Sequence, residues 1–433
     1  MLLRRLDLRG FTGDRRALRD ALPRPADEQE RSSAAVAAII AEVRAGGDDA
    51  LRALTERFDH VRLDELRVPA TEIEAATARL PGELRSALEV AHRRIRAYHT
   101  HEAATGDPGD FESDGIAVTH LLRPVTRAGC YAPGGRARYP STVLMCAVPA
   151  RVAGVAEVIL CVPPGPDGRV DDVTLAAAGV AGVDEVYRVG GAQAVAAMAY
   201  GTESIAPVDV IVGPGNRYVA EAKRQVSGVV GVASAFAGPS EVVVVADGDT
   251  PPELAAVDLV VQAEHGPDGL AWLITWSEPL ADAVSAAVER MVAASPRRAD
   301  LEATLAVGGY VALVDGPGQA FAVSNIVAPE HLEILTADAA ALLPLVDSAG
   351  AVFVGPSSPA SVGDYLAGPN HVLPTNRTAR FASALRVDDF RRHLHAVSVS
   401  EEALARLGPA VAVLAEAEGL PAHADSVRLR WPT

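Results

Sequence analysis

The sequence predicts an α/β protein with two open parallel sheets. Two observations carry this prediction. From about residue 124 onward, short β-branched runs alternate with alanine-rich helical stretches, which is the pattern of strand–helix–strand units in parallel sheets. The alternation supplies enough strands for two such sheets, with a division near residue 240. The chain has 433 residues, enough for about three ordinary domains, so two sheets and further helical parts fit its length.

The first 123 residues are expected to form a helical N-terminal region. Charged stretches of helical pattern fill it, among them SSAAVAAIIAEVRAGGDDALRALTERFD and GELRSALEVAHRRIRAYHTHEA. No group of catalytic residues falls there. We therefore expect a scaffold or packing role for this part of the chain.

Two Rossmann-like open-sheet domains are expected next, at 124–240 and 241–380, followed by a tail at 381–433. Strands of the first domain are predicted within AEVILCVPP, VDEVYRVGG and VDVIVGPGN, and those of the second within EVVVVAD, LAWLITW, YVALVD and GAVFVG. The tail contains one strand-like piece and two helical ones. We expect this tail to dock on another surface.

Composition argues against several classes of function. A formal net charge of −17 argues against a nucleic-acid surface and gives no reason to expect an anionic membrane as partner. The chain has no run of about 18 uncharged apolar residues, and its N-terminus lacks the apolar core of a signal peptide. Cys130, Cys146 and Cys161 include no CxxC pair, so they form neither a disulfide framework nor a zinc knuckle. A reducing cytoplasm is the expected location.

Lys223 is the single lysine of an arginine-rich chain. Chance is one explanation. The other is a requirement for a compact ammonium group at this position, which the planar guanidinium of arginine does not replace. The sequence leaves both open.

Three strands of the first sheet run directly into glycine turns, at 129–135, 189–194 and 212–216. Ligands of open α/β sheets bind beyond the carboxyl ends of the strands, where glycine lets the backbone approach a phosphate. Tyr131, Gln193 and Asn216 lie in these turns and offer hydrogen bonds or a stacking face. The usual G-x-G-x-x-G is absent, and each turn alone needs glycine for steric reasons too. Together they favour a nucleotide site.

A helix is predicted from about Pro251 to His265. Thr250 is a plausible cap, and Gly266-Pro267 is a stop signal. Residues three apart share a helix face, so Gln262 and His265 point the same way from the last turn. Taken alone, this pair fits a histidine at the negative end of the helix dipole beside a surface glutamine.

Three further stretches bring polar residues together: VAPEHLEIL with Glu330 and His331, SVGDYLAGPNHVLPT with Asp364 and His371, and AEAEGLPAHADSV with Glu418 and His423. Imidazole nitrogen and carboxylate or amide oxygen suit a metal such as zinc, so the candidate ligands are Gln262, His265, Asp364 and His423. A histidine beside a carboxylate is a natural acid–base pair near neutral pH. Spacing alone does not bring these distant segments together.

Eight stretches, in this order, resemble the histidinol dehydrogenase family: YAPGGRARYPSTVLM, VGGAQAVAAMAYGTESI, VDVIVGPGNRYVAEAKRQV, AGPSEV, QAEHGPD, PEHLEI, GDYLAGPNHVLPT and EGLPAH. The likeness runs from about Pro124 to the C-terminus. It implies oxidation of L-histidinol to L-histidine in two NAD-dependent steps through a bound aldehyde, the last steps of histidine biosynthesis. It also implies one zinc per subunit and a homodimer whose tail crosses to the partner.

The resemblance assigns roles residue by residue. Zinc would be held by Gln262, His265, Asp364 and His423, with the last of these serving the other subunit's site. His331 would take the alcohol proton, and Glu330 with His331 would activate water. NAD contacts would come from Tyr131, Gln193 and Asn216. Substrate contacts would come from Ser240, His371 and Glu418, together with His331 and the four zinc ligands.

Three departures from the family pattern leave loop geometry and substrate preference open. Ser234 stands where the family has an acidic residue, Asn376 and Arg377 stand where it has a glycine pair, and ASALRVDDF replaces SSGLSVDDF. One alternative is a paralogue with the same machinery and another primary alcohol as substrate. Another is a non-catalytic protein that binds a nucleotide or metal, which would have lost residues of the site. The ligand types suit zinc, manganese and cobalt alike.

Overall fold

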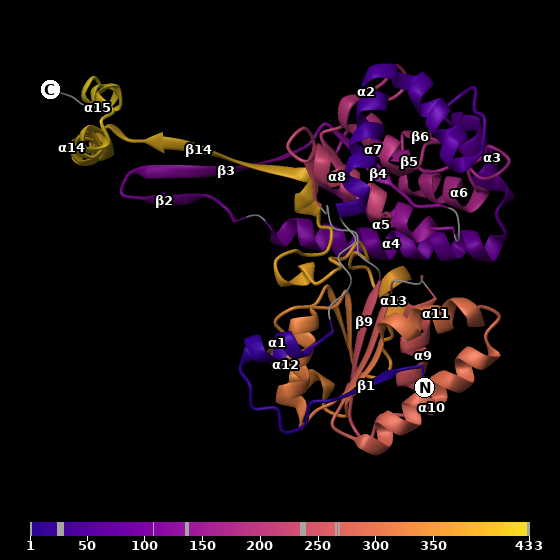
Figure 1. Ribbon diagram of the computed structural model, residues 1–433. Helices are drawn as coiled ribbons and strands as arrows, with labels where there is room; N and C mark the ends of the chain where they lie inside the picture. The colour runs from indigo at the N-terminus through magenta and orange to yellow at the C-terminus, as the bar shows by residue number, and fades with distance from the viewer. Residues whose placement is uncertain are drawn as a thin grey trace.

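Figure 1 shows the computed structural model of the chain, which describes residues 2–23, 30–106, 108–134, 138–233, 240–264, 266 and 269–430. Two α/β units lie one above the other in this view, and an arm projects sideways from the upper one. Each unit contains one parallel sheet with helices on both faces, as predicted. In the described part of the chain, no helix combines the length and the apolar character needed to cross a membrane.

The first unit contains a five-stranded parallel sheet of order β6-β5-β4-β7-β8. Its strands are β4 (Arg127–Tyr131), β5 (Glu157–Cys161), β6 (Glu185–Tyr187), β7 (Val210–Val212) and β8 (Gly231–Val232). The helices that follow them are α5 (Pro140–Ala153), α6 (Asp172–Ala181), α7 (Gly191–Tyr200) and α8 (Arg217–Val226). Because side chains alternate along a strand, the sheet contributes to a hydrophobic core on each of its two faces. Val158 faces α5 and α6, whereas Ile159 faces α7 and α8.

The second unit contains a six-stranded parallel sheet of order β1-β11-β10-β9-β12-β13. Its strands are β1 (Arg4–Asp7), β9 (Glu241–Ala246), β10 (Leu270–Thr275), β11 (Gly309–Leu313), β12 (His331–Ile334) and β13 (Ala351–Val354). The surrounding helices are α1 (Arg15–Ala21), α9 (Pro252–Ala263), α10 (Glu278–Ala294), α11 (Arg298–Gly308), α12 (Pro317–Val327) and α13 (Ala360–Tyr365), with a 3₁₀ turn η1 (Ala339–Leu345). Val242 and Val244 face α9–α11, whereas Val243 and Val245 face α1 and α12.

The N-terminal region is mainly helical, but it begins with a strand and ends in the two strands of the arm described below, and the sequence predicts none of the three. Helices α2 (Glu30–Asp59), α3 (Ala70–Arg79) and α4 (Gly82–Thr105) pack on the first unit. Strand β1 instead pairs with β11 at the edge of the second sheet. A short edge strand rich in charged residues has no strong local signal, and only its long-range pairing defines it.

The arm is formed by two segments that are distant in the sequence. Strand β14 (Arg391–Val399) runs antiparallel to β3 (Ile116–Pro124), with the short β2 (Phe111–Ser113) beside it. Before β14, the chain passes through two 3₁₀ turns, η2 (Thr378–Arg380) and η3 (Val387–Phe390). At the far end, α14 (Glu401–Ala417) and α15 (Pro421–Arg428) pack on each other (Figure 1). The predicted strand and two helices of the tail are therefore present.

Lys223 lies fully inside the first unit, on α8. Its ammonium group donates a hydrogen bond to the carbonyl oxygen of Gly213, in the turn that follows β7. That turn is tight: Gly213 has φ +107°, and a Cβ there would lie 2.1 Å from the carbonyl oxygen of Tyr131. Burial lowers the pKa of Lys223 to about 8. The only lysine thus stabilises a glycine turn at the carboxyl edge of the sheet through a buried hydrogen bond.

This burial gives a pH-dependent contribution to stability. Between pH 8 and pH 10.5 the unfolded chain binds a proton at Lys223 that the folded chain does not, so the free energy of unfolding rises with pH in this window. Between pH 7.5 and pH 10.5, we expect the free energy of unfolding of wild type to rise by about 3 kcal/mol relative to that of Lys223→Met. Urea unfolding of both proteins across this range measures the difference. If the free energies of unfolding of the two proteins change in parallel with pH, the Lys223 ammonium group is not desolvated in the folded state.

Candidate active site

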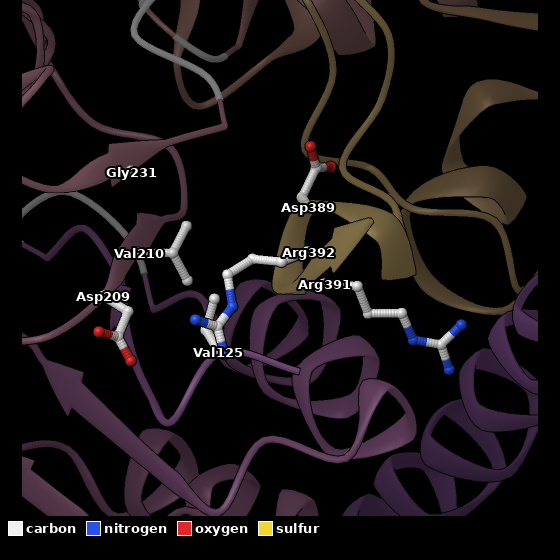
Figure 2. A pocket seen from close by; sticks show the side chains of 7 residues that line it. All are labelled: Val125, Asp209, Val210, Gly231, Asp389, Arg391 and Arg392. Atoms are coloured by element: carbon white, nitrogen blue, oxygen red, sulfur yellow. The ribbon is translucent and has the colours of Figure 1, made fainter. Parts of the chain in front are cut away.

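The surface hollow at the root of the arm contains none of the candidate site residues. Its volume is about 370 Å³, and it is lined by Val125, Asp209, Val210, Gly231, Asp389, Arg391 and Arg392. Figure 2 shows the Arg392 side chain extending toward Asp209, whereas Arg391 extends away. Both arginines donate to backbone carbonyls, Arg391 to Ala103 and Arg392 to Pro124. The hollow therefore belongs to the junction of arm and sheet, and the candidate residues meet elsewhere.

Glu330 and His331 lie at the amino end of β12, which the sequence analysis did not recognise as a strand. Both side chains are buried. Glu330 Oε2 accepts the backbone N–H of Glu241 at 3.1 Å, and Ser240 also hydrogen-bonds this carboxyl group. His331 Nδ1 lies 3.3 Å from the carbonyl oxygen of Glu241, so it carries the proton. The tautomer that results leaves Nε2 as the basic nitrogen.

Asp364 faces this basic nitrogen. Its Oδ1 lies 3.5 Å from His331 Nε2. The sequence predicts a broken loop around Asp364, but this residue lies in the short helix α13, at the end of the second unit that faces α4 (Figure 1). The imidazole of His331 is therefore bracketed by two carboxylates, with Glu330 Oε2 3.7 Å from Nδ1 on the other side.

Electrostatics at this cluster favour a bound cation. Burial opposes the charged form of His331, but the carboxylates of Glu330 and Asp364 outweigh it and raise the pKa of His331 to about 9. Burial raises the pKa of Glu330, and burial together with the Glu330 charge raises that of Glu241 to about 8. A cation held by Asp364 would cancel one of the charges that keep His331 protonated.

His371 joins the cluster and connects the two units. Its Nδ1 lies 2.8 Å from the backbone carbonyl of Asp364, and its Nε2 lies 3.4 Å from Thr142 Oγ1 on α5. The neighbouring Asn370 donates to the carbonyl of Met145, also on α5, at 2.6 Å. The structure thus brings Ser240, Glu330, His331, Asp364 and His371 together at the junction of the two units.

The remaining metal candidates are divided between this chain's body and its arm. Gln262 lies in the last turn of α9, the predicted helix, and its buried Nε2 has no hydrogen-bond partner among the described residues. His265 lies outside the described residues. Glu418 and His423 lie at the far end of the arm, on α15 and the turn before it (Figure 1). Within the described ranges no three His, Cys, Asp or Glu side chains converge as a complete metal site.

The three glycine turns meet at the carboxyl edge of the first sheet. Tyr131, at the end of β4, accepts the backbone N–H of Gly191, at the start of α7, with its hydroxyl at 3.0 Å. Gln193 is buried in the first turn of the same helix. Asn216 caps α8 by accepting the N–H groups of Tyr218 and Val219. The first two turns are therefore joined by a direct hydrogen bond.

Glu241 is a site residue that the sequence analysis did not single out. Its backbone contacts both Glu330 and His331, while its side chain accepts the backbone N–H groups of Asn376, at 3.1 Å, and Arg377. Asn376 and Arg377 have φ of 53° and 63°, in the left-handed region that glycine occupies most easily. The two departures from the family's glycine pair thus keep a glycine-like backbone, held by a buried carboxyl group. Ser234 lies outside the described residues.

Comparison with known proteins shows the family to which the chain belongs. The histidinol dehydrogenase family model matches residues 22–431. The chain belongs to the histidinol dehydrogenase family. It is 50% identical to histidinol dehydrogenase of Parasynechococcus marenigrum over 406 residues, covering 93% of this chain and 92% of that one. It is 47% identical to the Gluconobacter oxydans protein, covering 99% of each.

A crystal structure of histidinol dehydrogenase from Elizabethkingia anophelis has the same fold. It superposes with a TM-score of 0.93 at 34% identity, covering 99% of this chain and 98% of that one. The likeness therefore includes both units and the arm, beyond the motifs of the sequence.

Proposed function

We propose that the cluster at the junction of the two units oxidises L-histidinol to L-histidine in two successive NAD-dependent steps. Family membership makes the chain an oxidoreductase of histidine biosynthesis that converts histidinol to histidine. The observation that carries the site assignment is the buried Glu330–His331 pair, with Asp364 facing the basic nitrogen of the histidine. This arrangement provides a base beside a metal-binding carboxylate.

Gln262, His265 and Asp364 of one subunit, with a histidine at position 423, would hold the zinc. Two imidazoles, one carboxylate and one amide are a donor set that zinc accepts, and the unpartnered amide of Gln262 fits a ligand role. When bound, zinc would orient the hydroxyl and imidazole groups of the substrate, and NAD would accept hydride. The carboxyl groups of Glu330 and Asp364, which raise the pKa of His331, also suit a cationic amino alcohol.

The chain's own residues would move the protons. His331 Nε2 accepts the proton of the substrate hydroxyl, because its Nδ1–H is fixed on the Glu241 carbonyl. Glu330, held by two donors from Ser240 and Glu241, acts with His331 to take a proton from the water that attacks the aldehyde. Ser240 and His371 would contact the substrate. Tyr131, Gln193 and Asn216 would line the NAD side.

The arm supports a homodimer with shared active sites. Glu418 and His423 lie at its far end, on helices that pack on each other and leave apolar side chains exposed, among them Val413, Leu414 and Leu429. A projecting segment with an apolar surface favours docking on a second copy. His423 and Glu418 would then complete the partner's site.

The test is NAD reduction by purified protein with L-histidinol, before and after dialysis against a chelator and with zinc restored. We expect two NADH per histidine formed, loss of activity on chelation and its recovery with zinc. An acidic primary alcohol of similar size serves as the substrate control and should not turn over. No histidinol turnover by the zinc-loaded protein would overturn the proposal.

A further inference from the structure

Two acidic side chains that the proposed reaction does not use meet inside the second unit. Glu333 lies two residues after His331 on β12 and is only 1% exposed. Asp258 lies on α9 and hydrogen-bonds to the Glu333 carboxyl group. Buried acids are rare unless they are paired, so this contact calls for an explanation.

The pair connects the three elements that carry Gln262, His331 and Asp364. Strand alternation places Glu333 on the same face of β12 as His331. Glu333 Oε1 accepts the backbone N–H of Ala360 at 3.0 Å, and Ala360 begins α13, four residues before Asp364. Asp258 lies four residues before Gln262 and therefore shares its helix face. One carboxyl pair thus ties α9, β12 and α13 together.

Two carboxyl groups in hydrogen-bond contact need a proton between them. Glu333 Oε2 is buried and receives no N–H or hydroxyl donor from the described residues. Burial and the contact with Asp258 raise the pKa of Glu333 to about 9, while the charge of His331 on the same strand opposes the shift. Burial also raises the pKa of Asp258. At neutral pH the pair therefore holds a proton, which the two carboxyl groups share.

We propose that Asp258 and Glu333 are positioning residues, which share a proton and set the spacing of Gln262, His331 and Asp364 for the bound metal. The inference rests on the proposed zinc site. Metal sites depend on such surrounding contacts, whose loss costs about 10–100-fold in metal affinity.

Zinc affinity of the full-length protein tests this role. We expect Glu333→Leu to weaken zinc binding about 10–100-fold, because leucine releases both Asp258 and Ala360. Glu333→Gln should bind within about threefold of wild type, because its amide accepts from Ala360 and donates to Asp258. Asp258→Asn should also bind zinc within about threefold of wild type, because its amide donates a hydrogen bond to the Glu333 carboxylate. Glu102→Leu is the matched control: Glu102 also accepts a backbone N–H, from Val387 at 2.9 Å, but lies outside the site.

A pH series separates positioning from general stability. Above about pH 9 wild type loses the shared proton and the two carboxylates repel, whereas Glu333→Gln has no proton to lose. In chelator-buffered zinc, the affinity of wild type relative to Glu333→Gln should therefore fall between pH 7.5 and 10. This comparison holds even where Glu333→Leu fails to fold.

Three results would overturn the inference alone: zinc affinity of Glu333→Leu within threefold of wild type, an equal loss in Glu102→Leu, or a wild-type to Glu333→Gln ratio that stays flat with pH. A wild-type protein that binds no zinc and does not oxidise histidinol would instead overturn the proposed function, and the inference with it.

Discussion

His331→Asn is expected to lower kcat for histidinol oxidation by about 10²–10⁴-fold, with a much smaller change in KM. His331 Nε2 is the basic nitrogen of the cluster, and general-base catalysis contributes an acceleration of this size. Asparagine keeps a donor for the Glu241 carbonyl but has no nitrogen that accepts a proton. The loss should therefore appear in the chemical step, while the zinc ligands and the other substrate contacts remain.

Steady-state kinetics of NADH formation measure this effect at saturating NAD. His60→Asn is a suitable control, because His60 is exposed and has φ 59°, a conformation that asparagine tolerates. The control should keep the wild-type kcat. A fall of less than tenfold in His331→Asn would exclude this side chain as the base.

Mixing two inactive variants is expected to restore about a quarter of wild-type activity. His331→Asn damages the body of a subunit, whereas His423→Ala damages only the far end of its arm (Figure 1). If the arm serves the partner's site, each heterodimer contains one site with both defects and one with neither. Random exchange makes half of the dimers heterodimers, and half of their sites are intact.

The measurement needs subunit exchange, through mild denaturation and refolding of the equimolar mixture. Each variant refolded alone should stay about 100-fold or more below wild type, since small losses of substrate positioning are costly. No recovery in the mixture, with heterodimers verified by a size tag, would show that His423 serves its own chain or no site at all.

Much of the fold could be predicted because its signals are local. β-branched runs, glycine turns and the capped helix before Gln262 report their structure within a few residues. The candidate residues Glu330, His331 and Asp364 were also recognised, through motifs resembling a known family. The structure adds that they are in contact.

The rest depends on contacts between distant segments. Strand β1 exists only through its pairing with β11, and the arm only through the pairing of β14 with β3. Glu241 gains its importance from the elements it contacts, about 90 and 135 residues further along the chain. Asn376 and Arg377 adopt left-handed conformations that their side chains do not favour, so the fold imposes what local preference opposes.

The buried position of the only lysine also makes the folded protein an unusual target for chemical labelling. Reagents that acylate side-chain amines find none on the surface, because Lys223 is enclosed beneath the turn of Gly213. Modification of this residue requires the first unit to open. A single mass shift at one tryptic site therefore reports local or global unfolding directly, without any engineered probe.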